Sequence, residues 1–138
     1  MFKIAVKGVS FMPKLLIVDD EQDVREFAAN FFRKRKIEVD TASSGEEALG
    51  KFDQQKPDLV LLDIKMDGMD GVQTLKRLKE KDKDARVVMV TGRKPEENNT
   101  CQMCKELGAL DYVHKPLELH ELEKIVLANL NLPTGRQV

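Results

Sequence analysis

The segment that most constrains this chain is the short stretch 58–63, which follows Pro57, is apolar at 59–62 and ends on Asp63 before a Gly-rich turn. A run this short and this apolar is typical of a strand buried on both faces, as in parallel sheets. Ligands of open α/β sheets bind at the carboxyl ends of the strands. Asp63 is therefore predicted to do chemistry, although an aspartate there is also compatible with a simple turn.

Similar apolar runs alternate with helical patterns along the whole chain. The predicted strands are 14–18, 37–42, 58–63, 86–91 and 110–114, and the predicted helices are 21–36, 44–55, 71–80, 96–107 and 118–130. Asp20 is a candidate N-cap of the first helix and Ser44 of the second. The alternation predicts an α/β fold, a parallel sheet with helices on both faces. Residues 14–130 form the expected domain, between a loose extension (1–13) and a tail (131–138).

Charge and composition narrow the class of protein. The formal net charge of −1 implies no long-range attraction to nucleic acid or to a membrane surface. No apolar run approaches the ~20 residues that span a bilayer, and we expect a cytoplasmic protein. The spacing of Cys101 and Cys104 fits a redox pair or half a zinc site. Two cysteines three apart on a helix share a face, however, and more often simply pack.

Polar residues end the predicted strands, and in a parallel sheet these ends meet at one edge. They are Asp19 and Asp20 after the first strand, Asp63, Thr91 and Lys115. Carboxylates gathered there would repel one another unless a cation lay among them. Oxygen ligands suit Mg²⁺, and an aspartate can act as the nucleophile in phosphoryl transfer. Lys115 and Thr91 could then stabilise the phosphoryl group, so the sequence predicts phosphorylation of Asp63.

These residues, in this order, resemble the receiver domain of bacterial response regulators from about residue 14 to residue 130. The resemblance implies a flavodoxin-like, doubly wound five-stranded sheet of order 2-1-3-4-5, flanked by five helices. It implies that Asp63 is the phospho-acceptor and that Thr91 and Lys115 contact the phosphoryl group. The implied Mg²⁺ ligands are Asp20, Asp19 (often through water), Asp63 and the backbone carbonyl of Lys65. The Lys115–Pro116 bond would be cis.

The resemblance also implies a signalling role rather than an enzymatic one beyond the chain's own phosphorylation and slow dephosphorylation. A histidine kinase or a histidine phosphotransferase would phosphorylate the chain in a two-component system or phosphorelay. Tyr112 falls where the family has an aromatic side chain that swings inward on activation, after movement of Thr91, and so alters a partner-binding face. The chain is expected to be a stand-alone receiver, similar to chemotaxis regulators and sporulation-type phosphorelay intermediates.

Two departures from the family pattern concern the loop after Asp63. Asp67 stands where most receivers have Pro and adds a carboxylate near the site. Lys65 and Arg93 are basic, two residues after Asp63 and Thr91, and face the route of an attacking water. We hypothesise that Lys65 hinders this water and prolongs the phosphorylated state.

Two other functions fit part of the pattern. One is a Mg²⁺-dependent phosphohydrolase with an aspartate nucleophile, as in haloacid-dehalogenase-like enzymes, but those have an Asp-x-Asp arrangement and a cap. Here the aspartates Asp19 and Asp20 are adjacent. The other is a receiver fragment of a DNA-binding transcriptional regulator, against which the small net charge argues.

Overall fold

The structure is a computed structural model that describes residues 12–92 and 97–130. Its sheet contains β1 (Lys14–Val18), β2 (Glu38–Ala42), β3 (Leu59–Asp63), β4 (Val87–Thr91) and β5 (Asp111–His114). Its helices are α1 (Gln22–Arg33), α2 (Gly45–Gln55), α3 (Gly71–Lys81), α4 (Glu97–Glu106) and α5 (Leu119–Asn129). The strands are parallel in the order β2-β1-β3-β4-β5, which confirms the predicted fold class.

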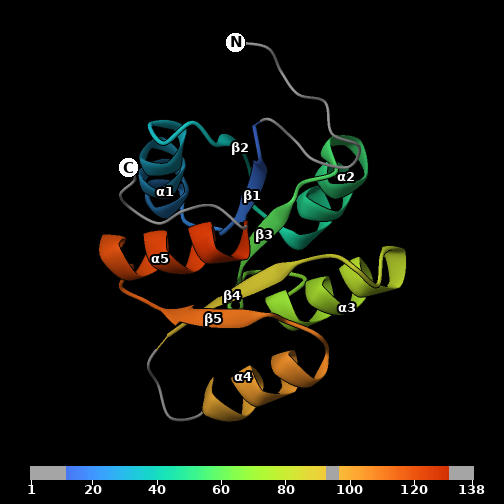
Figure 1. Cartoon of the computed structure of the whole chain (residues 1–138). Helices are drawn as coiled ribbons and strands as arrows, with labels where there is room; N and C mark the ends of the chain where they lie inside the picture. The colour runs from blue at the N-terminus through green and yellow to red at the C-terminus, as the bar shows by residue number, and fades with distance from the viewer. Residues whose placement is uncertain (1–11, 93–96, 131–138) are drawn as a thin grey trace.

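The helices cover the two faces of the sheet as separate layers (Figure 1). α1 and α5 pack on one face, through Phe32 and Leu122 among others. α2, α3 and α4 pack on the other face, where Phe52 and Leu75 belong to the second apolar cluster. The central strand β3 contacts both layers and is buried along its whole length. This double burial explains why its sequence is continuously apolar up to Asp63.

Of the two N-caps predicted from the sequence, one is confirmed and one is wrong. Ser44 caps α2, since its hydroxyl accepts a hydrogen bond from the amide of Glu47 (3.1 Å). The prediction for Asp20 is wrong, because Glu21 is the N-cap of α1 and makes no side-chain cap bond. Asp70 caps α3 by accepting from the amide of Gln73 (3.0 Å).

The exposed edge of β2 is covered by side chains. The carbonyl of Val39 accepts a hydrogen bond from Arg33 (3.1 Å). The amide of Thr41 donates to the Asp40 carboxylate (2.8 Å), and the carbonyl of Thr41 accepts from Lys51. Because these main-chain groups point away from β1, their side-chain partners occupy positions where a further strand would otherwise pair.

Several expectations concern the ends of the chain and its two cysteines. The extension, apart from residues 12 and 13, and the tail 131–138 lie outside the described residues, as does Arg93. Cys101 and Cys104 are buried in the α2–α3–α4 cluster, which confirms that they pack.

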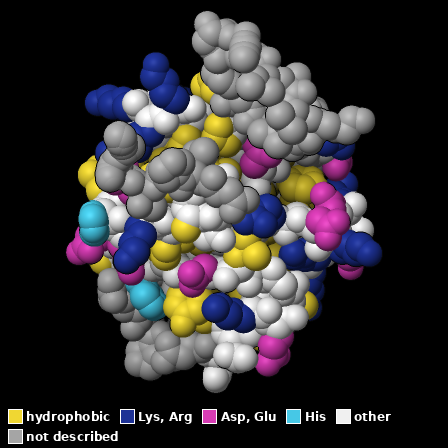
Figure 2. Space-filling view, in the orientation of Figure 1, with side chains coloured by type: hydrophobic (Ala, Val, Ile, Leu, Met, Phe, Trp, Pro, Cys, Tyr) yellow, Lys and Arg dark blue, Asp and Glu magenta, His cyan; other side chains and the backbone are white. Residues whose placement is uncertain are grey.

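None of the helices within 12–92 and 97–130 has the length and apolar character needed to cross a bilayer. Figure 2 shows acidic and basic side chains interspersed over the visible face, in keeping with the small net charge.

Candidate functional site

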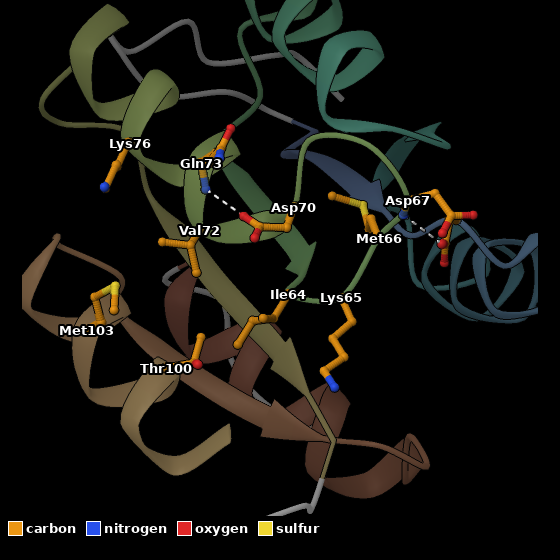
Figure 3. Close-up of a pocket in the computed structure, with 11 residues that line it drawn as sticks. Ile64, Lys65, Met66, Asp67, Asp70, Val72, Gln73, Lys76, Thr100 and Met103 are labelled. Carbon is orange, nitrogen blue, oxygen red and sulfur yellow. Dashed lines mark hydrogen bonds between the residues drawn. The ribbon is translucent and has the colours of Figure 1, made fainter. Parts of the chain in front are cut away.

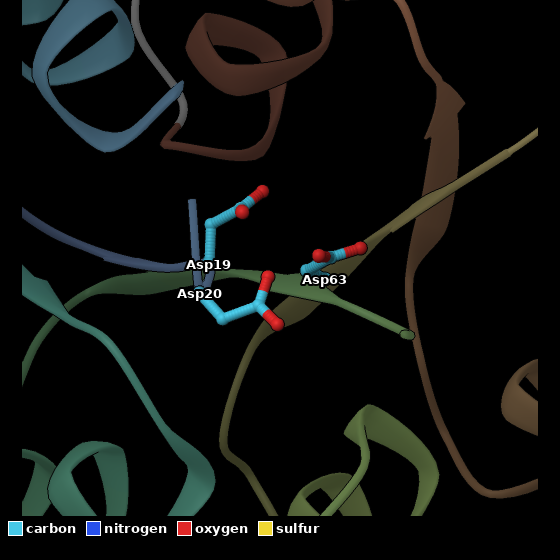
Figure 4. A group of neighbouring side chains, drawn as sticks. All are labelled: Asp19, Asp20 and Asp63. Carbon is cyan, nitrogen blue, oxygen red and sulfur yellow. The ribbon is translucent and has the colours of Figure 1, made fainter. Parts of the chain in front are cut away.

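Three aspartates meet at the carboxyl edge of the sheet (Figure 4). Val18 pairs with Leu62 in the parallel register, so the residues that follow them, Asp19 and Asp63, come side by side. Each of Asp19, Asp20 and Asp63 offers a carboxylate oxygen, and these oxygens all lie within 4.8 Å of one another. The predicted gathering of the acids is therefore present in the fold.

Lys115 brings a positive charge to this group from the end of β5. Its ammonium nitrogen Nζ lies 3.0 Å from Asp19 Oδ2 and 3.2 Å from Asp63 Oδ2. Both aspartates are buried, at 2% and 3% exposure. The same nitrogen also lies 3.0 Å from Oε1 of Glu21, a contact that sequence reasoning did not predict. Glu21 adjoins the two aspartates in sequence, and this adjacency was the available signal.

The electrostatics of the group follow from burial and from crowding of like charges. Burial and, after it, the charge on Asp19 raise the pKa of the Asp63 carboxyl to about 7, although the ammonium of Lys115 acts in the opposite direction. Burial alone would lower the pKa of Lys115, but hydrogen bonds to Asp19 and Glu21 raise it above its usual range. Lys115 is thus firmly protonated, while Asp63 is poised between its neutral and ionised forms.

Main-chain contacts fix Asp19 in place. Its amide donates to the carbonyl of Ala42 (3.1 Å), and its carbonyl accepts from the guanidinium of Arg25 (2.7 Å). Its carboxylate oxygen Oδ1 accepts from the amide of Glu21 (2.9 Å). Arg25, on α1, is a second residue that sequence reasoning missed, since its role depends on a contact with the turn that precedes the helix.

Gly71 holds the far end of the loop that follows Asp63. Its amide donates to the carbonyl of Ile64 (2.8 Å), and the amide of Ile64 donates to the carbonyl of Val90 on β4 (2.9 Å). A Cβ atom at position 71 would overlap the carbonyl oxygen of Asp63. The first turn of α3 can therefore approach β3 this closely only with glycine at this position.

The other predicted residues lie around this group. Thr91 is buried at the end of β4, directly after the residue that pairs with Asp63, and its carbonyl accepts from the amide of Lys115 (2.7 Å). Tyr112 is half-buried on β5, with its ring centroid 5.6 Å from that of His114 and 5.6 Å from the ammonium of Lys105. The Lys115–Pro116 bond is cis, as expected.

The loop between β3 and α3 borders a hollow of about 630 Å³ that extends to α4 (Figure 3). Lys65 and Asp67 are exposed on this loop and extend in different directions. The amide of Asp67 donates to Oδ2 of Asp20 (3.3 Å), so the loop contacts the acidic group through its main chain. The group within 4.8 Å consists of the three aspartates named above, and the predicted fourth carboxylate, Asp67, is not among them.

Comparison with known proteins identifies the family. The model described as "Response regulator receiver domain" matches residues 15–127. The chain belongs to the response regulator receiver family. The match covers the sheet from the second residue of β1 onward and all five helices up to Leu127 of α5. It assigns the chain to two-component signalling, in which a receiver accepts a phosphoryl group on an aspartate, and not to the phosphohydrolases considered above.

Individual receivers resemble the chain over most of its length. Sporulation initiation phosphotransferase F of Bacillus subtilis (strain 168) is 40% identical over 122 residues, which are 88% of this chain and 97% of that protein. Regulatory protein AtoC of Escherichia coli (strain K12) is 38% identical over 90% of this chain, but the chain spans only 26% of AtoC. The solved receiver domain of Clostridium thermocellum superposes with a TM-score of 0.81 at 26% identity, covering 87% and 95% of the two chains.

Proposed function

We propose that this receiver accepts a phosphoryl group on Asp63 from a phosphohistidine of a histidine kinase or a histidine phosphotransferase, with Mg²⁺ as cofactor. The observation that supports it best is the position of Asp63: its Oδ2 lies 3.2 Å from the ammonium of Lys115, within a buried group of three carboxylates. The likeness to sporulation initiation phosphotransferase F favours a place in a phosphorelay. We also propose a cytoplasmic location, which suits the two free, buried cysteines.

The residues at this edge fit a magnesium ion. Asp19, Asp20 and Asp63 offer only oxygen ligands, the kind that Mg²⁺ prefers, and the carbonyl of Lys65 is the proposed fourth protein ligand. The pKa of Asp63 is raised chiefly by burial and next by the charge on Asp19, and the ammonium of Lys115 does not bring it back to its usual range. When bound, Mg²⁺ would balance the carboxylates and the incoming phosphoryl oxygens, and would keep Asp63 ionised.

The chain's own residues would then carry out the transfer. A carboxylate oxygen of ionised Asp63 attacks phosphorus as the bond between phosphorus and the donor's imidazole nitrogen breaks, and that nitrogen keeps the electron pair. The ammonium of Lys115 stabilises the charge on the phosphoryl oxygens, and the hydroxyl of Thr91 donates a hydrogen bond to one of them. Burial of Asp63 limits access of water to the product.

A surface beside the site suits the approach of the donor. Val24, Phe27, Pro116 and Leu117 line a hollow of about 450 Å³ that also borders Lys115. Phe27 is 49% exposed and adjoins the other apolar side chains of this hollow, and a contiguous apolar patch of this kind is typical of a binding surface. We propose that an apolar helix face of the kinase or phosphotransferase packs here and brings its histidine to Asp63.

The response to phosphorylation would be local at first. Thr91 shifts toward the phosphoryl group, and Tyr112 moves into the space beside it. His114 and Lys105, which contact the ring of Tyr112, transmit the change to the surface of β5 and α4. The downstream protein would bind this surface.

Intact mass spectrometry after incubation with acetyl phosphate and MgCl₂ tests the proposal. We expect the wild type to gain the mass of one phosphoryl group, and chelation of Mg²⁺ to prevent it. Asp63→Asn should gain none. Asp40→Asn, which alters the aspartate of β2 that pairs with Lys51, should gain as much as the wild type. Equal uptake by Asp63→Asn and the wild type would refute the assignment of Asp63.

A further inference from the structure

Lys115 contacts three carboxylates, and one of them does not belong to the acidic group. Asp19 and Asp63 are buried members of that group, whereas Glu21 lies on the solvent side with 63% of its side chain exposed. We propose that Glu21 is a positioning residue that retains Lys115 at the site while Asp19 and Asp63 bind the divalent cation. This inference rests on the function proposed above, because it requires that Asp19 and Asp63 hold a cation.

The argument begins with competition for oxygen atoms. In the structure, the ammonium of Lys115 lies against Oδ2 of both Asp19 and Asp63. A divalent cation bound by these two carboxylates would repel the ammonium and draw electron density from its partners. If Lys115 had only these partners, binding of the cation would leave the ammonium poorly paired and partly buried, which is unfavourable.

Glu21 provides a partner that the cation does not take. Its Oε1 lies 3.0 Å from the ammonium, and its carboxylate is outside the group of oxygens within 4.8 Å. An ammonium has three donor hydrogens, so Lys115 can keep a hydrogen bond to Glu21 while its other contacts change. The lysine would then remain beside Asp63 for an incoming phosphoryl group.

The backbone holds Glu21 in a defined place for this task. Its amide donates to Oδ1 of Asp19, and its carbonyl accepts from the amide of Arg25 in the first turn of α1. The guanidinium of Arg25 in turn holds the carbonyl of Asp19. These bonds fix the main chain of Glu21 beside Asp19, and from there its carboxylate reaches Lys115 from outside the group of three aspartates.

The chain offers a matched control for the loss of one negative charge. Asp23 lies in the first turn of α1 and lines the same hollow as Glu21. Among the described residues, the ion pairs of Lys115 go to Asp19, Glu21 and Asp63, and not to Asp23. Asp23→Asn therefore reproduces the change in net charge made by Glu21→Gln without removing the contact with Lys115.

The test is calorimetric titration of the full chain with MgCl₂ in the absence of any phosphoryl donor. We expect Glu21→Gln to bind Mg²⁺ about fivefold more weakly than Asp23→Asn. A change of this size corresponds to the loss of one exposed ion pair. A second readout is acetylation of Lys115 by acetic anhydride in saturating Mg²⁺, followed by peptide mass spectrometry. Labelling of Lys115 should rise in Glu21→Gln and not in Asp23→Asn.

The outcomes separate the two proposals. Saturable binding by the wild type with equal affinity in both variants would overturn the role of Glu21 and leave the magnesium site standing. Absence of saturable binding to the wild type would overturn both. Thermal melting without Mg²⁺ should be the same for the two variants, so that any difference in affinity is not a difference in folding.

Discussion

Two lysine–aspartate pairs of nearly equal length lie at different places on the same sheet. On the edge strand β2, Asp40 lies 3.1 Å from the ammonium of Lys51. At the end of the central strand β3, Asp63 lies 3.2 Å from the ammonium of Lys115. The side chain of Asp40 is 39% exposed, whereas that of Asp63 is 5% exposed.

Burial, and not distance, separates what the two pairs do. Lys51 also pairs with Glu47 and donates to the carbonyl of Thr41, so its pair covers the outer edge of the sheet. Asp63 is buried and has the carboxylate of Asp19 beside it, and together these raise its pKa to about 7. A lysine and an aspartate thus cover a strand edge in one place and form a buried pair with a raised carboxyl pKa in the other.

The largest contrast should come from removing the lysines. Lys115→Met leaves Asp19 and Asp63 buried without a cation and should cost about 3 kcal/mol of unfolding free energy at pH 8 without divalent ions. Lys51→Met breaks an exposed pair and should cost less than about 1 kcal/mol. Urea denaturation of both variants measures the difference. Equal losses would show that burial does not separate the pairs.

Removing the aspartates should produce a smaller effect of opposite sign at Asp63. Asp63→Asn should raise the unfolding free energy by about 2 kcal/mol at pH 8 without divalent ions, because it removes a buried charge beside Asp19. Asp40→Asn should lower the unfolding free energy by less than about 1 kcal/mol. A destabilised Asp63→Asn variant would count against the crowding of charge at this edge.

The advantage of Asp63→Asn should also depend on pH. The folded protein raises the pKa of Asp63 from 3.8 to about 7, so the fold favours the protonated carboxyl. This contribution is present in full below pH 4 and is lost as the pH rises through 7. The wild type should therefore become less stable relative to Asp63→Asn between about pH 4 and pH 7. A difference that stays constant over this range would contradict the pKa.

The smallest expected effect is that of salt. The coupling energy of each pair is measured by a double-mutant cycle, once at about 0.1 M NaCl and once at about 1 M NaCl. The coupling of Asp40 with Lys51 should fall by about 0.5 kcal/mol, since salt screens exposed charges. The coupling of Asp63 with Lys115 should change less, because the Asp63 side chain is only 5% exposed whereas that of Asp40 is 39% exposed. A larger salt effect at Asp63 would show that the site is open to solvent.

The features that were predictable from sequence depend on local pattern. The continuous apolar character of β3 identified a strand buried on both faces, and the order of strands and helices then brought Asp19 and Asp63 to one edge. The cap at Ser44 was predictable because the bond to Glu47 is local. The cap predicted at Asp20 was wrong, because its place in sequence does not show that the fold turns its side chain toward Asp63 (Figure 4).

Contacts between distant segments were the least predictable. Glu21 and Lys115 are separated by 94 positions, and no periodicity links them. The hydrogen bond from the guanidinium of Arg25 to the carbonyl of Asp19 was equally unpredictable, because the helix was predicted from the spacing of its apolar residues alone. Even within a family assigned from motifs, such supporting contacts required the coordinates.

The close approach at Gly71 has a consequence for how receivers of this kind can diversify. The hydrogen bond from the amide of Gly71 to the carbonyl of Ile64 closes the segment between them into a loop, and both ends of this loop lie against β3. Substitutions at the exposed loop positions Lys65 or Asp67 change the charge and bulk of the loop without altering the main-chain contacts next to Asp63. Under the function proposed above, we propose that exchange of these exposed side chains alters the lifetime of the phosphorylated state while the main chain beside Asp63 keeps its position.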